Sequence, residues 1–212
     1  MLYPFIRALR GKDISINRNR PAKLEGIRFA PGPDGQPDGS VEFSGRPSSY
    51  IRLPNTRPTK DSITLLIWIF SKGTQGPIFH FTTGKSRQIF NPGMILQLSL
   101  SRPNIVANFL RRRGRRASLR ANLKGKIRPR RWYFIGLSYN KNNGIARLYV
   151  NNRVVARKTI GSFNLATNFP VRMGAVKGNR RWFRGRVSCL QLYKVPLTTG
   201  QIAARARRCF SK

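Results

Sequence analysis

Short runs of apolar and β-branched residues, separated by turn residues, recur along this chain and favour strands over helices. Eleven such runs follow one another: Val41–Phe43, Tyr50–Leu53, Ile63–Phe70, Pro77–Phe81, Met94–Leu100, Ile105–Leu110, Trp132–Tyr139, Ala146–Val150, Val154–Ile160, Val171–Gly174 and Arg184–Tyr193. Asn143-Gly144 and Asn151-Asn152 lie between runs, and these residue types adopt the positive φ angles of two-residue hairpin turns. Many short strands with frequent turns predict an all-β sandwich or barrel.

The segments before and after these runs differ from them. Residues 1–39 are predicted to form a basic N-terminal extension, which has no clear hydrophobic period and ends in a Pro- and Gly-rich joint at Pro31–Gly39. Residues 40–212 are predicted to form one domain, and the extension packs on this domain or binds alongside it. One short C-terminal helix is predicted over Thr198–Arg208, with Thr198 or Thr199 as its N-cap.

Acidic residues are confined to the beginning of the chain. The formal net charge is +36, from 42 Lys and Arg against 6 Asp and Glu, and no acid follows Asp61. Arg outnumbers Lys 30 to 12, and a guanidinium can bind two oxygens of a sulfate, phosphate or carboxylate at once. A surface adapted only for solubility would mix both signs of charge. The composition therefore predicts a polyanionic partner.

One basic segment indicates how such a partner would be held. After the loop Arg111–Arg116, small and apolar residues alternate with polar ones as far as Lys124, which predicts a strand with one cationic face. The inward set is Ala117, Leu119, Ala121 and Leu123. The residues predicted to bind the polyanion are Arg111, Arg112, Arg113, Arg115, Arg116, Arg120, Lys124, Arg128, Arg130 and Arg131, with a second cluster of Arg180, Arg181, Arg184 and Arg186. The alternative is that these runs only form a solvated face.

Five parts of the chain, in order, resemble a known family. Ser40–Pro54, with its F-x-G and its Tyr-Ile-Arg-Leu-Pro, is similar to the opening of laminin-G-like domains, and Ser62–Ile69 resembles the Trp-containing strand that follows. Trp132–Tyr139 and Ala146–Val154 resemble a later strand and its Tyr-Val-Asn hairpin, and Phe183–Tyr193 resembles the pattern F-x-G-x-I-x-C. From residue 40 to residue 209 the chain thus resembles laminin-G-like and pentraxin-like domains of the concanavalin A-like jelly rolls.

The resemblance carries several expectations. It implies an antiparallel β-sandwich of the jelly-roll type with a binding or adhesive role, without identifying the ligand. It also implies a disulfide between Cys189 and Cys209, because those positions are bridged in similar domains; two free thiols are the alternative. A disulfide indicates an oxidising compartment, so the resemblance favours a secreted protein whose leader has been removed.

Localisation stays open when only the sequence is considered. Met1–Arg7 lacks the apolar stretch and cleavage site of a signal peptide. The protein is therefore cytosolic or nuclear, or the chain begins after a removed leader. No apolar run is long enough to predict a membrane span.

The same superfamily includes glucan hydrolases, but the residues of their chemistry are missing. Retaining glycosidases need two carboxylates about 5 Å apart, and the Glu-x-Asp-x-x-Glu stretch of the related hydrolases does not occur. There is no Gly-x-Ser-x-Gly motif, and His80 is the only imidazole. We therefore predict that the protein is not an enzyme. With one His, two widely spaced Cys and no late carboxylate, neither a metal site nor a cofactor is expected.

These observations predict a non-catalytic, lectin-like extracellular protein that binds sulfated or acidic glycans of a matrix through its Arg-rich surfaces. A biomineral-associated scaffold, for silica or an acidic mineral matrix, is the first alternative because uniform positive charge suits a mineral surface. A nucleic-acid-binding basic protein is the second, although no known nucleic-acid-binding module is visible. A fourth possibility, an acidic protein partner or copies of the chain bridged by anions, overlaps the glycan-binding and mineral-scaffold predictions.

Overall fold

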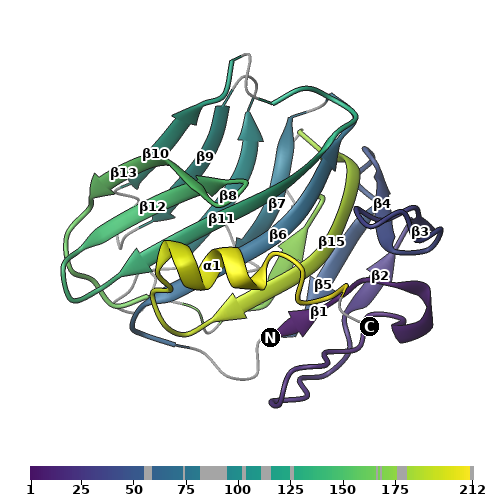
Figure 1. The fold of residues 1–212 in the computed structure, drawn as a ribbon, viewed down its shortest axis with the longest axis horizontal. Coiled ribbons are helices and arrows are strands. Elements are labelled where there is room, and N and C mark those ends of the chain that lie inside the picture. The colour runs from purple at the N-terminus through teal and green to yellow at the C-terminus, as the bar shows by residue number, and fades with distance from the viewer. Residues whose placement is uncertain are drawn as a thin grey trace.

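The fold was analysed in a computed structural model of the chain. It describes residues 1–54, 59–73, 75–81, 95–101, 104–110, 116–124, 127–165, 167, 169–175 and 181–210. Two antiparallel sheets form two layers of a sandwich, and the one α-helix among these residues lies across the outer face of one of the sheets (Figure 1).

Sheet A, of eight strands, has the order β13-β12-β11-β6-β15-β4-β3, and β1 also pairs with β15. Its strands are β1 (Leu2–Tyr3), β3 (Ile27–Ala30), β4 (Ser40–Ser44), β6 (Ile63–Ser71), β11 (Trp132–Asn140), β12 (Ile145–Val150), β13 (Arg153–Thr159) and β15 (Arg184–Tyr193). Sheet B, of seven strands, has the order β10-β9-β8-β7-β14-β5-β2. Its strands are β2 (Lys23–Glu25), β5 (Tyr50–Leu53), β7 (Gly76–Phe81), β8 (Ile95–Ser101), β9 (Asn104–Leu110), β10 (Arg116–Asn122) and β14 (Val171–Met173).

The predicted all-β antiparallel sandwich is confirmed, and each of the eleven predicted runs overlaps a strand, with Met94 of the fifth run lying outside the described residues. Alternating residues of the central strands, such as Leu65 and Ile67 of β6 and Ile135 and Leu137 of β11, are fully buried between the sheets. These side chains face one core because successive residues of a strand point to opposite faces.

The two predicted hairpin turns have different outcomes. Asn151 and Asn152 both have positive φ, 46° and 66°, and join β12 to β13 as predicted. Between β11 and β12, in contrast, the connection is the four residues 141–144, in which only Gly144 has positive φ. The prediction of a two-residue turn at Asn143-Gly144 was therefore wrong. A Cβ on Gly144 would approach the carbonyl carbon of Gly161 to 2.6 Å, so packing also requires glycine here.

Residues 1–39 contribute strands to both sheets, which their sequence did not predict. β1 pairs with β15, β3 pairs with β4, and β2 pairs with β5. The side chains of Tyr3 and Phe5 are fully buried in the common core. This segment therefore packs on the rest of the chain, one of the two arrangements expected for it. Its strands have two to four residues, too few to show a period of their own.

A buried carboxylate fastens this N-terminal segment. Asp13 accepts hydrogen bonds from the backbone N–H groups of Leu2, Ser15 and Asn19, at 2.7, 2.9 and 3.0 Å. Burial by itself would raise the pKa of Asp13, but these hydrogen bonds outweigh it and the pKa lies below its ordinary value. The ionised side chain thus holds β1 and the loop that follows it together.

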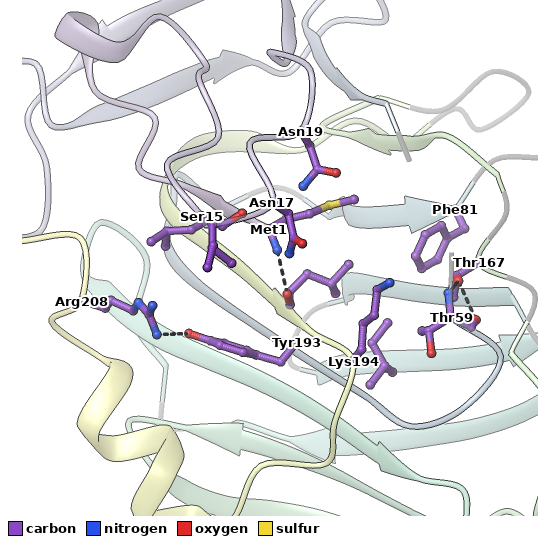
Figure 2. Close-up of a pocket in the computed structure, with 14 residues that line it drawn as sticks. Met1, Ser15, Asn17, Asn19, Thr59, Phe81, Thr167, Tyr193, Lys194 and Arg208 are labelled. Carbon is purple, nitrogen blue, oxygen red and sulfur yellow. Dashed lines mark hydrogen bonds between the residues drawn. The ribbon is translucent and has the colours of Figure 1, made fainter. Parts of the chain in front are cut away.

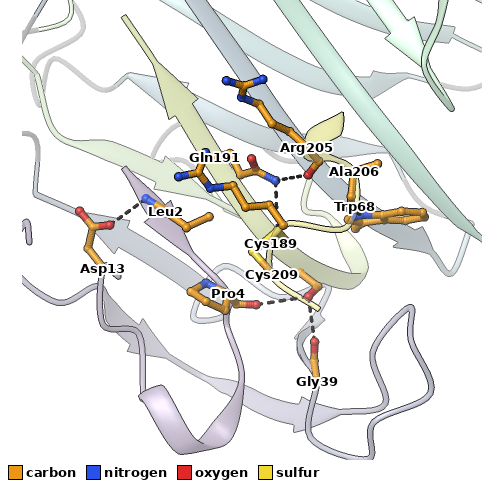
Figure 3. The surroundings of a disulfide bond; sticks show 12 residues. Leu2, Pro4, Asp13, Gly39, Trp68, Cys189, Gln191, Arg205, Ala206 and Cys209 are labelled. Atoms are coloured by element: carbon orange, nitrogen blue, oxygen red, sulfur yellow. Dashed lines mark hydrogen bonds between the residues drawn. A yellow bond between two sulfur atoms is a disulfide. The ribbon is translucent and has the colours of Figure 1, made fainter. Parts of the chain in front are cut away.

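The C-terminal segment is held to the outer face of sheet A by three kinds of interaction (Figure 3). The structure contains the Cys189–Cys209 disulfide that the family resemblance implied, with the two Cα atoms 5.7 Å apart. Trp68 Nε1 donates to the carbonyl of Ala206 at 2.7 Å, and Gln191 Nε2 donates to that of Arg205 at 2.9 Å. Fully buried Ile202 packs with residues of β6, β11 and β12 in a second, smaller apolar cluster.

The helix itself is shorter than predicted. α1 (Thr199–Arg205) begins after the N-cap Thr198, which forms a reciprocal capping box with Gln201. It ends at Arg205 rather than Arg208, and turns follow as far as residue 210. The side chains of sheet A that bind the carbonyls of Arg205 and Ala206 take over the hydrogen bonds that a longer helix would have made. In the described part of the chain, no helix has the length and apolar character needed to cross a membrane.

Candidate functional site

The predicted cationic strand is β10, and the alternation of its side chains is confirmed. Leu119 and Ala121 are 3% and 1% exposed and face the core, whereas Ser118, Arg120 and Asn122 are exposed. Lys124, just after the strand, is also exposed. β10 is the edge strand of sheet B and pairs only with β9 among the described residues, so its cations lie at the edge of this sheet.

The fold places a second basic strand beside this edge. β13, the edge strand of sheet A, contacts β10, and the two lie side by side at one end of the sheets (Figure 1). Lys158 Nζ of β13 donates to the carbonyl of Ser118 in β10 at 3.2 Å. Arg153 and Arg157 of β13 are exposed. We name the exposed cations of the two edge strands the basic edge: Arg120, Lys124, Arg153, Arg157 and Lys158.

Positive charge is concentrated at the basic edge, and no ion pair with an acidic residue neutralises it among the described residues. Arg157 lies directly opposite Arg147 of β12 in the strand register, and like charges in such a position destabilise a sheet. The six ion pairs among the described residues involve Glu25, Asp38, Glu42 and Asp61, and none of them uses a cation of β10, β12 or β13. An external anion would therefore relieve repulsion at the basic edge.

The carboxylates are engaged elsewhere, and Glu42 of β4 is the clearest case. Its side chain is 7% exposed, and it binds Arg28 at 3.2 Å, Arg186 at 3.2 Å and Lys72. Burial would raise the pKa of Glu42, but hydrogen bonds from Lys72 and Arg28 outweigh it, so the pKa lies below its ordinary value. The ionised Glu42 side chain of β4 thus links cations of β3 and β15 through ion pairs.

The other predicted site residues divide into three groups. Arg111, Arg112, Arg113, Arg115 and Arg180 lie outside the described residues, and of Arg116 only its place at the start of β10 is described. Exposed side chains belong to Arg128, Arg130, Arg131, Arg181 and Arg184. Arg186, in contrast, is 21% exposed, binds Glu42 and lies 4.9 Å from the ring centroid of Phe70. We therefore leave Arg186 out of the proposed binding surface.

The segments that contain Arg130 and Arg184 approach each other at one end of β6. The backbone N–H of Arg130 donates to the carbonyl of Ser71 at 2.7 Å, and the N–H of Lys72 donates to the carbonyl of Arg184 at 3.0 Å. The turn that contains Arg128–Arg131 and the start of β15 therefore flank the same strand end. The sequence had placed Arg128, Arg130 and Arg131 with the β10 run instead.

A cavity that the sequence did not indicate lies between the N-terminal loop and the end of β15 (Figure 2). Its volume is about 350 Å³, and its wall includes Asn17, Asn19, Phe81, Lys194 and Arg208. Arg208 Nη1 donates to the hydroxyl of Tyr193 at 3.3 Å. The described residues that line it include two cations and no carboxylate, so it could admit a small anionic group.

The comparisons with known proteins agree with this architecture. A family model described as the concanavalin A-like lectin/glucanases superfamily matches residues 44–203. The chain belongs to this superfamily. No curated protein matches the chain. Among the described residues of this lectin-like sandwich, no group of three His, Cys, Asp or Glu side chains could hold a metal ion.

Solved structures share the fold of this superfamily member at low sequence identity. The binding domain of botulinum neurotoxin serotype G superposes with a TM-score of 0.75 at 11% identity, over 96% of this chain and 49% of that one, so our chain spans about half of its length. Domain 4 of AbnA, a GH43 extracellular arabinanase from Geobacillus stearothermophilus solved with arabinotriose, has a TM-score of 0.74 at 18% identity, over 97% and 96% of the two chains. A heptameric SAP-like pentraxin from Limulus polyphemus has a TM-score of 0.60 at 17% identity, over 77% and 79%.

Proposed function

We propose that this protein is a non-catalytic, lectin-like extracellular protein that binds polyanions, with sulfated or acidic glycans of a matrix as its ligands. The observation that carries the proposal is the basic edge, where cations from the edge strands of both sheets gather and form no ion pair with any acid in the described part of the chain. Such a surface attracts an extended anion, and arginine adds bidentate contacts to sulfate or carboxylate groups. The predicted contacts at Arg111–Arg116, Arg128–Arg131 and Arg180–Arg184 belong to the same proposal.

Two further observations support a glycan and an extracellular setting. The superfamily is one of lectins and glucanases, and the arabinanase domain of similar fold was solved with an oligosaccharide. The Cys189–Cys209 disulfide is typical of proteins in oxidising compartments. A secreted protein that contacts acidic matrix polysaccharides accounts for the fold, the disulfide and the charge together.

The state of the carboxylates supports a binding role rather than hydrolysis. A glycosidase requires one carboxyl group as acid and another as nucleophile or base, both facing the sugar. The two buried acids, Asp13 and Glu42, are already occupied by backbone N–H groups and by three cations, respectively. Asp38 is half-buried and binds Arg7, and Asp61 is exposed and binds Lys141.

Binding to a sulfated heparin-type oligosaccharide and to its desulfated counterpart, measured by calorimetry over a range of salt concentrations, tests the proposal. We expect the sulfated form to bind more tightly, and its affinity to fall as salt rises because bound counterions are released. The triple variant R120Q/K124Q/R157Q should weaken binding and flatten the salt dependence. The control R10Q/R18Q/R20Q removes the same charge from exposed arginines of the N-terminal segment and should retain most of the affinity.

Two outcomes would contradict the glycan proposal. Equal affinity for the sulfated and desulfated oligosaccharides would refute it outright. Equal, salt-labile binding to the sulfated oligosaccharide, colloidal silica and duplex DNA, with the two triple variants weakened alike, would mean that net charge alone acts. That result would favour the biomineral-associated scaffold, our alternative function.

A further inference from the structure

A row of cations crosses the outer face of sheet B, on strands that the sequence does not place together. In the strand register Lys23 of β2, which forms an ion pair with Glu25 at 2.8 Å, lies opposite Arg52 of β5, and Arg52 lies opposite Arg172 of β14. Residues directly opposite each other in a sheet share a face. This face is the outer one, because the neighbouring residues Ile51 and Val171 are fully buried in the core whereas Arg52 and Lys23 are exposed.

Arg172, in the middle of this sheet, has the geometry of an anion receptor. Its guanidinium carbon lies over the Tyr50 ring, 3.6 Å from the ring centroid, which is a close cation–π contact. Its Nε is buried and has no hydrogen-bond acceptor. Among the described residues, no ion pair or side-chain hydrogen bond is formed by Arg172 or Arg52, although both take part in the backbone pairing of their strands. Leaving a buried donor without an acceptor costs free energy of folding. An anion bound at the exposed edge of the stack would offset the neighbouring positive charges of Arg172 and Arg52.

The same row continues with residues other than Lys and Arg. His80 of β7 lies opposite Arg172, and then come Gln97 of β8, Asn108 of β9 and Ser118 of β10. Four strand steps of about 4.8 Å separate Arg172 from Ser118, roughly 19 Å in all. The Ser118 hydroxyl donates to Asn108 Oδ1 at 2.7 Å, and Ser118 adjoins the basic edge through Lys158. Cations thus occupy one half of the row, and the other half ends in the amide of Asn108 and the hydroxyl of Ser118.

This distribution favours an acidic polysaccharide over a nucleic acid. A nucleic-acid strand carries a phosphate at every residue and would be matched by cations along the whole row. A polysaccharide with both acidic and neutral sugars presents anionic groups at some positions and hydroxyl groups at others. Amide and hydroxyl side chains can donate to and accept from sugar hydroxyls.

We propose that Arg172, stacked on Tyr50 and flanked by Arg52, binds the carboxylate or sulfate of one acidic sugar, while neutral sugars of the same chain run across sheet B towards Ser118. This inference rests on the proposed function and specifies the site at which the arrangement of acidic and neutral sugars, and not charge alone, would determine binding. The guanidinium fork would hold two oxygens of the acidic group, and the basic edge would attract the remainder of the chain.

The test compares three single substitutions in the full chain with a defined sulfated hexasaccharide as the probe. R172Q should weaken binding about tenfold or more, the scale of a lost charge-assisted contact. R172K keeps the charge but lacks the fork, so it should lose most of the same affinity. R10Q, at an exposed arginine of the N-terminal segment, is the charge-matched control and should bind within about twofold of the wild type. Thermal unfolding of each variant establishes that it is folded.

The outcomes separate this inference from the proposed function. If R172K binds as the wild type does and R172Q is no weaker than R10Q, while the wild type still prefers the sulfated probe, the Arg172 site is wrong and the proposed function stands. If the wild type shows no preference for sulfation, the proposed function fails first. An equal loss of affinity by R172Q for a single-stranded oligonucleotide of the same charge would overturn the assignment to a glycan.

Discussion

Replacing Glu42 by glutamine removes the one negative charge that three cations share, and we expect a clear loss of stability. The carboxylate is 7% exposed, and Lys72 and Arg186 around it are only 24% and 21% exposed. Breaking a buried ion pair by removing one partner costs about 3–5 kcal/mol. Because Arg28 is 75% exposed and can be resolvated, we expect about 2–3 kcal/mol for Glu42→Gln.

Thermal unfolding followed by circular dichroism measures this loss. For a domain of this size each kcal/mol corresponds to about 2–4 °C, so the midpoint should fall by roughly 4–12 °C at pH 7. Asp38→Asn is the matched control, because the Asp38–Arg7 pair is also a carboxylate with an arginine but its side chains are 45% and 61% exposed. Exposed pairs contribute about 0–1 kcal/mol. Equal midpoints for Glu42→Gln and Asp38→Asn would refute the argument that burial makes Glu42 important.

The pH dependence gives a second, independent check of the same reasoning. The pKa of Glu42 is lower in the folded protein than its ordinary value of 4.5. Its stabilising contribution is therefore fully present above that ordinary value and is lost as the pH falls through the folded-state pKa. The difference in midpoint between the wild type and Glu42→Gln should shrink as the pH falls below 4.5. A difference that stays constant down to pH 2 would exclude a charge effect.

Two other predictions concern the ends of the chain. Cys189→Ser should destabilise the oxidised protein by about 3 kcal/mol, the chain-entropy value for a loop closed by residues 20 apart. Under reducing conditions the variant and the wild type should have nearly the same stability. Equal stability under oxidising conditions would contradict the role of the disulfide. Asp13→Asn weakens the acceptor shared by three backbone N–H groups, so the amides of Leu2, Ser15 and Asn19 should exchange hydrogen faster; unchanged exchange would show that β1 is held by its pairing with β15 alone.

Local patterns were sufficient for the part of the fold in which each strand is long enough to show alternation. The inward positions Leu119 and Ala121 of β10 were predicted and are buried, because a single strand with one buried face carries that pattern by itself. The N-terminal strands were missed since Leu2–Tyr3 and Lys23–Glu25 are too short to show a period. The helix end was missed because Trp68, far away in the sequence, binds the carbonyl of Ala206.

The sequence by itself determined the fold class and the sign of the protein's own net charge, because strand patterning and net charge are sums over local composition. Only the tertiary structure decided which cations are neighbours. It placed Lys158 of β13 next to β10 and Arg172 over Tyr50 beside Arg52. It also paired Arg186 with Glu42, so that Arg186 is not part of the exposed cationic surface. These pairings depend on strand order and register across two sheets, which are fixed by burial of the common core and leave no mark in the local spacing of the charged residues.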